Sequence, residues 1–97
     1  MSTVLVRYRV KAGREAENVA LVEAVYAELA EKKPEGLRYM TVVGDDGRTF
    51  FHLAEISSEK NPLLETDAFR AFQRGIRERC DEPPQPLPVS PVGAYGF

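Results

Sequence analysis

The sequence predicts an α+β fold whose elements follow the order strand, helix, strand, strand, helix, strand. Three observations predict it. Apolar and polar residues alternate in short segments, apolar residues recur every three or four positions in two longer segments, and glycine or proline separates most segments. The length of 97 residues and the hydrophobic content of 43% fit one small globular domain that covers residues 1–97.

The first strand is expected at residues 3–10 and the first helix at residues 14–33. In the strand, every second residue from Val4 to Val10 is apolar or aromatic and shares one face. The helix has acidic residues in its first turn, where the helix dipole favours negative charge, and Pro34 ends it. Its buried stripe consists of Val22, Val25, Tyr26 and Leu29.

The second and third strands are expected at residues 37–43 and 48–56. The turn between them reads Gly44-Asp45-Asp46-Gly47, and aspartate and glycine tolerate the positive φ angles that tight turns require. The two strands are therefore predicted to pair antiparallel as a hairpin.

The second helix is expected to begin at Thr66 or Asp67, either of which can cap it, and to end near Cys80. Glycine is unfavourable inside a helix, so Gly75 is interpreted as a close approach to a neighbouring backbone. The buried face of this helix consists of Phe69, Phe72 and Ile76. Its arginines are interspersed with acidic residues and are interpreted as a solvent-exposed face: Arg70, Arg74, Arg77 and Arg79.

Prolines dominate residues 81–91 and exclude a helix or a central strand there. We interpret this segment as a stiff extended connection, and its PxxP spacings leave open recognition by a proline-binding module. A last strand is expected at residues 92–97. Tyr95 and Phe97 would share one of its faces, with the terminus packed against the domain.

This order of elements is the split βαβ arrangement of ferredoxin-like folds, a four-stranded antiparallel sheet with both helices on one face. The third strand is apolar on both faces, with Phe51 and Leu53 on one side and Phe50, Ala54 and Ile56 on the other. Because both helices cover the same face, the second face is predicted to pack against another copy of the chain as a two-fold homodimer.

These features resemble the dimeric α+β barrel superfamily, and within it the antibiotic-biosynthesis-monooxygenase type. The resemblance rests on the opening V-L-V-R-Y-R-V-K-A-G-R-E, the strand F-F-H-L-A-E-I, and D-A-F-R-A-F in the second helix. It implies two ferredoxin-like chains packed sheet against sheet. It also implies an activity like that of cofactor-independent monooxygenases of aromatic polyketides and quinols, or of haem-degrading enzymes.

The haem-degrading members bind iron through a histidine near the start of the second long helix, beside an asparagine and a tryptophan. Residues 63–69 contain no histidine, and the chain contains no tryptophan. That haem site is therefore not carried over, and no cofactor is expected.

Composition narrows the classes of partner. The net charge of −2 does not fit a nucleic-acid binder, which neutralises phosphates with Lys and Arg. The single cysteine, Cys80, excludes an intramolecular disulfide. The sequence shows neither a signal peptide nor an apolar stretch of about 20 residues that could span a membrane, so no membrane partner and a cytoplasmic location are expected.

His52, the only histidine, is the candidate catalytic base because its pKa lies near neutrality. The alternative is a histidine that is hydrogen-bonded within the sheet or the dimer interface. One histidine cannot form a metal site alone, so no metal is expected.

The candidate substrate-binding residues are strand arginines and tyrosines: Arg7, Arg9, Arg38, Tyr39 and Tyr95. A buried arginine must be paired or touch a bound anion, so these arginines could recognise a carboxylate or an enolate. The alternative is pairing with Glu55 or with an acid of the partner chain, or exposure at the sheet margin. The tyrosine hydroxyls could orient an aromatic or quinone-like ligand, the alternative being core aromatics with a hydrated hydroxyl.

Two functions follow. The first is cofactor-independent oxidation of a small aromatic or quinol-like substrate by a homodimer. The substrate would lose a proton to His52, and a strand arginine or tyrosine would stabilise the enolate. The second is a non-catalytic ligand-binding or structural homodimer of the same fold.

Overall fold

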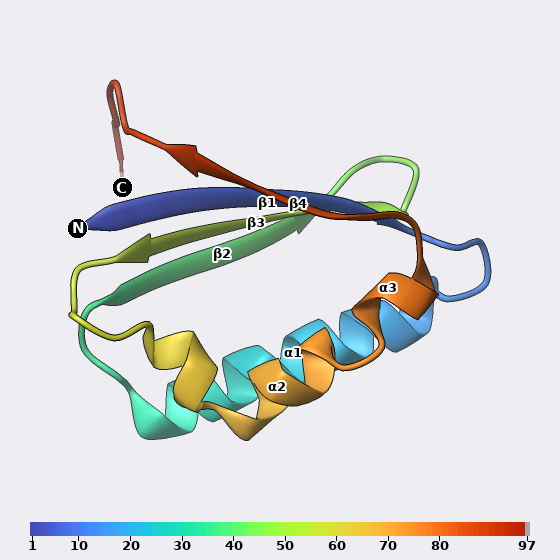
Figure 1. The fold of residues 1–97 in the computed structure, drawn as a ribbon, viewed down its shortest axis with the longest axis horizontal. Helices are drawn as coiled ribbons and strands as arrows, with labels where there is room; N and C mark the ends of the chain where they lie inside the picture. Colours follow the sequence, from blue (N-terminus) through green and yellow to red (C-terminus); the bar gives the residue numbers. More distant parts are fainter. Residues whose placement is uncertain (97) are drawn as a thin grey trace.

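The computed structural model, which describes residues 1–96, places a four-stranded antiparallel sheet over a layer of helices (Figure 1). The strand order is β2-β3-β1-β4, so β1 and β3 are central and β2 and β4 are edges. The elements are β1 (Ser2–Val10), α1 (Glu15–Lys32), β2 (Leu37–Val43), β3 (Thr49–Ile56), the 3-10 helix η1 (Pro62–Glu65), α2 (Asp67–Gln73), α3 (Ile76–Arg79) and β4 (Cys80–Val89). The predicted ferredoxin-like α+β order is confirmed.

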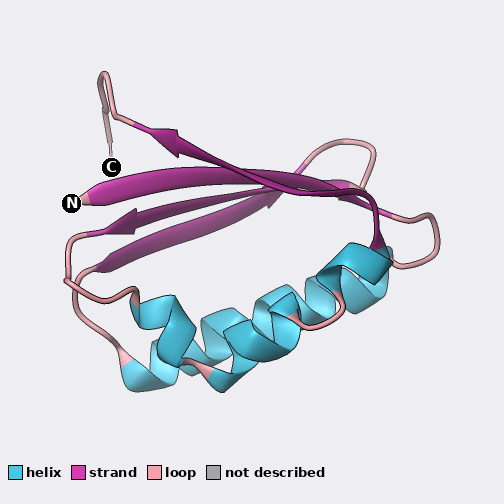
Figure 2. Cartoon of the chain, viewed as in Figure 1, coloured by secondary structure: helices cyan, strands magenta, loops and turns pink. Residues whose placement is uncertain are grey.

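All helices that the structure describes lie on one face of the sheet, and none of them covers the opposite face (Figure 2). The core between sheet and helices contains Tyr8, Val10, Val22, Val25, Phe50, Ala54, Leu63, Phe72 and Cys80. These residues include Tyr8 and Val10 of the face predicted for the first strand, with Val4 and Val6 partly buried beside them, and Val22 and Val25 of the stripe predicted for the first helix. We call the uncovered side of the sheet the open face.

The predicted hairpin between β2 and β3 is confirmed. Gly47 has φ +70°, which lies in the left-handed region that glycine adopts without strain. The Asp46 carboxylate accepts hydrogen bonds from the backbone N–H groups of Arg48 and Thr49, both at 2.9 Å. These bonds, together with one from the Thr49 hydroxyl, hold the pKa of Asp46 well below its usual value.

The second helix is capped as predicted but is not continuous. Thr66 caps α2, since its Oγ1 accepts from the Phe69 N–H at 3.3 Å. The helix then breaks at Arg74 and Gly75 before α3 begins. A Cβ at Gly75 would meet nothing within 4 Å, so the predicted close approach is wrong. The glycine is needed instead for its φ of +78°, at the break between α2 and α3.

The last strand lies earlier in the sequence than predicted. The proline-rich segment is itself β4, which pairs antiparallel with β1 from Val89 to Cys80. Proline lacks an N–H and is tolerated in an edge strand because one side of that strand needs no partner. Residues 92–96 form no strand, so the expectation of a strand at 92–97 is wrong over that range, and Phe97 lies outside the described residues.

Candidate functional site

A cavity of about 220 Å³ lies between the sheet and the α2–α3 helices. Its walls are largely apolar and come from β1, from η1 and the following helices, and from the prolines of β4. The polar aromatic groups on its sheet side belong to Tyr8, Tyr39 and His52. Mostly apolar walls with a few convergent polar groups are the usual form of a small-molecule site.

His52 is at the centre of these groups. It lies in β3 on the helix-facing side of the sheet and is only 5% exposed. Its Nε2 is 2.8 Å from the Tyr8 hydroxyl oxygen, and its Nδ1 is hydrogen-bonded to the Tyr39 hydroxyl. Thr41 Oγ1 lies 3.3 Å from the same Nδ1 and 2.8 Å from the Tyr26 hydroxyl. The sheet register explains this grouping. Val6 of β1 and Thr41 of β2 lie directly opposite His52 in the sheet. Tyr8 lies two residues after Val6 and Tyr39 two residues before Thr41, so both are on the same face as His52.

A second set of polar residues reaches the same site from the helices. Asn18 of α1 is fully buried, and its Nδ2 donates to the Tyr8 hydroxyl at 2.9 Å. Arg79, at the end of α3, is 2% exposed, and its Nε donates to Asn18 Oδ1 at 3.1 Å. Its guanidinium also donates to the Phe72 carbonyl oxygen at 2.9 Å and lies over the Phe72 ring. A continuous chain of hydrogen bonds therefore runs from Arg79 to His52.

Burial sets the protonation states of the site. It lowers the pKa of His52 to about 4, so the imidazole is neutral at pH 7. It raises the pKa of Tyr8 and of Tyr39 above the usual tyrosine value, so both hydroxyls keep their protons. The resting site is thus a set of neutral dipoles beside one buried cation, Arg79.

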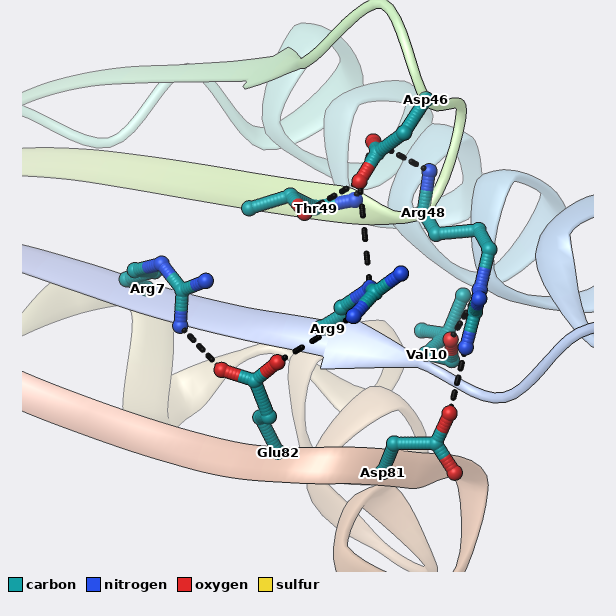
Figure 3. Close-up of polar contacts among 8 residues, drawn as sticks. All are labelled: Arg7, Arg9, Val10, Asp46, Arg48, Thr49, Asp81 and Glu82. Carbon is teal, nitrogen blue, oxygen red and sulfur yellow. Dashed lines mark hydrogen bonds and ion pairs between the residues drawn. The ribbon is translucent and has the colours of Figure 1, made fainter.

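The predicted arginines lie on the open face, on the other side of the sheet from His52. Arg7 and Arg9 both contact the Glu82 carboxylate, at 2.8 and 3.5 Å, and Arg9 lies 3.8 Å from Asp46 (Figure 3). Arg48 pairs with Asp81 beside them. Arg7 and Arg9 are therefore paired within the chain, with acids other than the Glu55 or partner-chain acid given above as the alternative.

Arg38 pairs with Glu55 at 3.3 Å, which is the pairing given above as the alternative. Both residues line a second, larger hollow of about 440 Å³ between the open face and residues 89–94. This hollow is bounded by exposed chain on one side, and the charges of Arg38 and Glu55 in its lining are paired with each other. The chemistry is therefore concentrated in the smaller cavity.

Tyr95 is 96% exposed on the segment after β4. Of the candidate residues, the structure brings together His52 and Tyr39 and leaves Arg7, Arg9, Arg38 and Tyr95 outside their cavity.

Known structures share the fold of this chain at low sequence identity. A candidate antibiotic biosynthesis monooxygenase from Nitrosomonas europaea has a TM-score of 0.79 at 14% identity, over 96% of this chain and 100% of its own. A second from Bacteroides thetaiotaomicron has a TM-score of 0.79 at 15% identity, over 99% and 92%. SnoaB, a cofactor-independent oxygenase from Streptomyces nogalater, has a TM-score of 0.70 at 15% identity, over 99% and 97%. No family model and no curated protein matches the chain.

The chain has the antibiotic-biosynthesis-monooxygenase-like fold. It is the fold that the resemblance inferred from the sequence implied for one chain. At these identities the comparison assigns the fold and not the residues of the site.

Within this monooxygenase-like fold, sequence reasoning missed Asn18 and Arg79. Arg79 was expected on a solvent-exposed helix face, and its burial shows that this expectation was wrong. A signal was present, because Asn18 stands four residues before Val22 and Arg79 stands three residues after Ile76, both in register with the buried stripes. A polar residue in an apolar stripe marks a buried hydrogen-bonded position.

Among residues 1–96, no group of three or more His, Cys, Asp or Glu side chains is placed to hold a metal ion. None of the helices described is both long enough and apolar enough to cross a membrane.

Proposed function

We propose that this chain is a cofactor-independent oxygenase that oxidises a small aromatic or quinol-like molecule in the cavity beside His52. The observation that carries the proposal is the convergence of Tyr8, Tyr39 and His52 on one otherwise apolar cavity. The fold shared with SnoaB, a cofactor-independent oxygenase, supports the activity. The volume of about 220 Å³ lies below the roughly 300–1,000 Å³ of common ligand pockets, which favours a small substrate.

In this reaction the substrate itself supplies the electrons. A proton leaves a ring CH₂ group, as in an anthrone or in the keto tautomer of a quinol, and its electron pair stays on the substrate as an enolate. The enolate carbon bonds to dioxygen and, on protonation, becomes a hydroperoxide. Loss of water then leaves a carbonyl, so CH₂ and O₂ give C=O and H₂O. One oxygen atom stays in the product and the other leaves as water.

The cavity residues suit these steps. Neutral His52 offers the lone pair that accepts the proton, and the Tyr39 hydroxyl can donate to the enolate oxygen. The free protein holds His52 as a weak base, with a pKa of about 4. An enolate bound beside the ring raises that pKa, because a neighbouring negative charge favours the imidazolium form.

Oxygen consumption with a panel of hydroquinones, naphthoquinols and anthrones tests the proposal. Wild-type protein is expected to consume oxygen with at least one member, with 18O from labelled O₂ appearing in the product. His52→Ala and Tyr39→Phe are expected to lose tenfold or more of the rate, since general acid–base groups contribute about 10²–10⁴-fold. Tyr95→Phe is the matched control, because Tyr95 is exposed outside the cavity, and it should keep the full rate.

A non-catalytic ligand-binding role is the second candidate. Both ring nitrogens of His52 already have hydrogen-bond partners, and its low pKa makes it a poor base in the free protein. Calorimetric binding of a panel member without any oxygen uptake would favour this role and exclude the oxygenase.

We also propose that the open face is covered by a second copy of the chain. Met40, Val42 and Leu87 on this face are 44%, 49% and 58% exposed, and apolar surface of this kind is unfavourable in water. The charges around them are paired within the chain, Arg7 and Arg9 with Glu82 and Arg38 with Glu55. A like face can therefore pack against the apolar centre without leaving an unpaired charge.

Light scattering at micromolar concentration tests the homodimer. The mass should be about twice 10.9 kDa. Val42→Glu is expected to give monomers, because it places charge in the apolar centre. Val19→Glu is the matched control: Val19 is 39% exposed on α1, away from the open face, and this variant should stay dimeric. A monomeric wild-type mass would overturn the proposed pairing.

A further inference from the structure

The hydrogen-bond chain from Arg79 to His52 has a direction that its donor groups determine. Arginine has only donors, so its Nε–H requires an acceptor at Asn18, and the oxygen of the Asn18 amide must face Arg79. The amide nitrogen then faces the Tyr8 hydroxyl and donates to its oxygen at 2.9 Å. The orientation of Asn18 thus follows from its buried arginine neighbour.

The Tyr8 hydroxyl carries one proton, and among the described residues its two partners are Asn18 and His52. Because Asn18 donates to its oxygen, the Tyr8 proton has the Nε2 lone pair of His52 as its acceptor. In the reverse arrangement Nε2–H would donate to Tyr8, and the Tyr8 proton would be left without an acceptor. Tyr8 is 1% exposed, and a buried donor without a partner costs about 1–3 kcal/mol.

We propose that Asn18 and Arg79 are positioning residues that hold neutral His52 in the Nδ1–H tautomer. The Nε2 lone pair is then directed at the Tyr8 hydroxyl, and Nδ1–H donates to the Tyr39 hydroxyl. The role of this arrangement in a reaction rests on the function proposed above, whereas the tautomer itself does not.

The tautomer assigns the proton path of the proposed oxidation. The proton-accepting nitrogen is Nε2, which is reached through Tyr8. As the substrate proton bonds to the Tyr8 oxygen, the original Tyr8 proton moves to Nε2. The electron pair of the broken bond stays on the substrate, Tyr8 remains neutral, and His52 becomes an imidazolium.

The same direction defines what a ligand must offer. The Tyr39 hydroxyl accepts from Nδ1–H and keeps its own proton, for which a ligand oxygen in the cavity competes with Thr41. A ligand with a hydrogen-bond-accepting oxygen, such as a ketone, quinone or enolate, fits this donor. A hydrocarbon of the same shape has no oxygen to accept a hydrogen bond from the Tyr39 hydroxyl.

The burial of Arg79 indicates that the hydrogen-bond chain does more than stabilise the fold. It is a buried cation with no carboxylate within 4.0 Å in the part of the chain that the structure describes. A buried charge without an opposite charge is destabilising, and apolar side chains of similar volume are often as stable or better. The charge lies one residue away from Tyr8 along the chain of hydrogen bonds, where it favours negative charge on the hydroxyl oxygen and lowers the pKa of Tyr8 against the effect of burial.

Because His52 is the only histidine, a two-bond ¹H–¹⁵N correlation spectrum of ¹⁵N-labelled protein reports its tautomer without ambiguity. At pH 7 the wild type is expected to show a protonated Nδ1 and an unprotonated Nε2. Asn18→Asp is nearly isosteric and places a carboxylate against Arg79, so the fold should tolerate it. The carboxylate cannot donate to Tyr8, so Tyr8 turns its proton toward it and the tautomer switches to Nε2–H.

Gln85→Glu is the matched control. Gln85 is an exposed residue of β4 opposite Arg7 and does not line the cavity, so the same change from amide to carboxylate should leave the tautomer of His52 unchanged. Arg79→Met should give a mixture of both tautomers, because the Asn18 amide is then free to turn over, and Arg79→Lys should restore the wild-type form.

An Nε2–H tautomer in the wild type, or an unchanged tautomer in Asn18→Asp, would overturn the inference. Neither result depends on a ligand, so they are distinct from a failure of the oxygenase proposal. If a quinol substrate is turned over, Asn18→Asp is expected to lower kcat tenfold or more and to shift its pH profile, with KM little changed.

Discussion

Lowering the pH from 7 to 5 should already destabilise this protein, because His52 is buried in its neutral form. Burial lowers the pKa of His52 in the folded chain to about 4, whereas an unfolded histidine has a pKa of about 6.5. Between these two values the unfolded state binds one more proton than the folded state. Stability is therefore complete above about pH 6.5 and decreases as the pH falls toward about 4.

The size of the effect follows from the two pKa values. Proton linkage for a single group with these values gives a loss of about 2 kcal/mol between pH 7 and pH 5 at 25 °C. The acids with lowered pKa values, such as Glu28 and Glu82, contribute mainly below about pH 4.5, where unfolded carboxylates begin to take up protons. The interval from pH 7 to pH 5 therefore isolates His52.

Urea unfolding followed by circular dichroism at pH 7, 6 and 5 measures this loss. The protein concentration must be the same throughout, because association would stabilise the folded state by mass action. His52→Gln cannot titrate in this range and is expected to have the same free energy of unfolding at pH 7 and pH 5. A wild type that is equally stable at both pH values would refute the reasoning, as would an equal loss in His52→Gln.

Further predictions concern the ends of α2. Gly75→Ala should lower the free energy of unfolding by about 1–2 kcal/mol, because φ +78° is strained for any residue with a Cβ. Gly93→Ala, which also meets nothing within 4 Å and lies outside the left-handed region, should change it little. Thr66→Ala should lose about 1 kcal/mol, since the Thr66 hydroxyl caps α2 and donates to the Leu63 carbonyl oxygen at 2.7 Å. Thr66→Ser keeps both bonds and should recover most of that loss; equal unfolding midpoints for Thr66→Ala and wild type would contradict the cap.

The regular elements were predictable because their side-chain periods are simple. Alternation gave the three strands β1, β2 and β3, and the spacing from Val22 to Leu29 gave α1, each within two residues of the observed bounds. The wrong predictions concern proline and glycine, because each of these residue types occurs in more than one kind of structure. Prolines excluded a central strand correctly, but residues 81–91 give no local sign that an edge strand of the sheet lies there, since that depends on which strand it pairs with. The role of Gly75 depends on its positive φ angle, which cannot be inferred from the spacing of residues in the sequence.

The candidate site was predictable only in part. His52 could be named because it is the only histidine, and Tyr39 because its hydroxyl lies on a strand face with apolar residues. The arginines of β1 and β2 could not be assigned to a side of the sheet until the helices were placed, and their acidic partners Glu82 and Glu55 come from other strands. The burial of Asn18 and Arg79 can be read from their spacing, but the contact between them, across 61 residues, leaves no trace in the local sequence.

The hydrogen-bond chain from Arg79 to His52 lies within the hydrophobic core of the domain. This explains why the residues of the hydrogen-bond chain were hard to recognise from the sequence. Asn18 and Arg79 stand at helix positions where an apolar side chain would be expected, and Tyr8 and His52 stand on the buried face of the two central strands. A domain of 97 residues buries only about two-thirds of its unfolded surface, so it has few core positions to give to polar groups. Four hydrogen-bonded polar groups at buried positions stabilise the fold only when every donor has an acceptor. That requirement fixes one hydrogen-bond direction, and it leaves the Tyr39 hydroxyl at the wall of the cavity. The arrangement that satisfies the core is thus the same arrangement that presents a donor to a ligand.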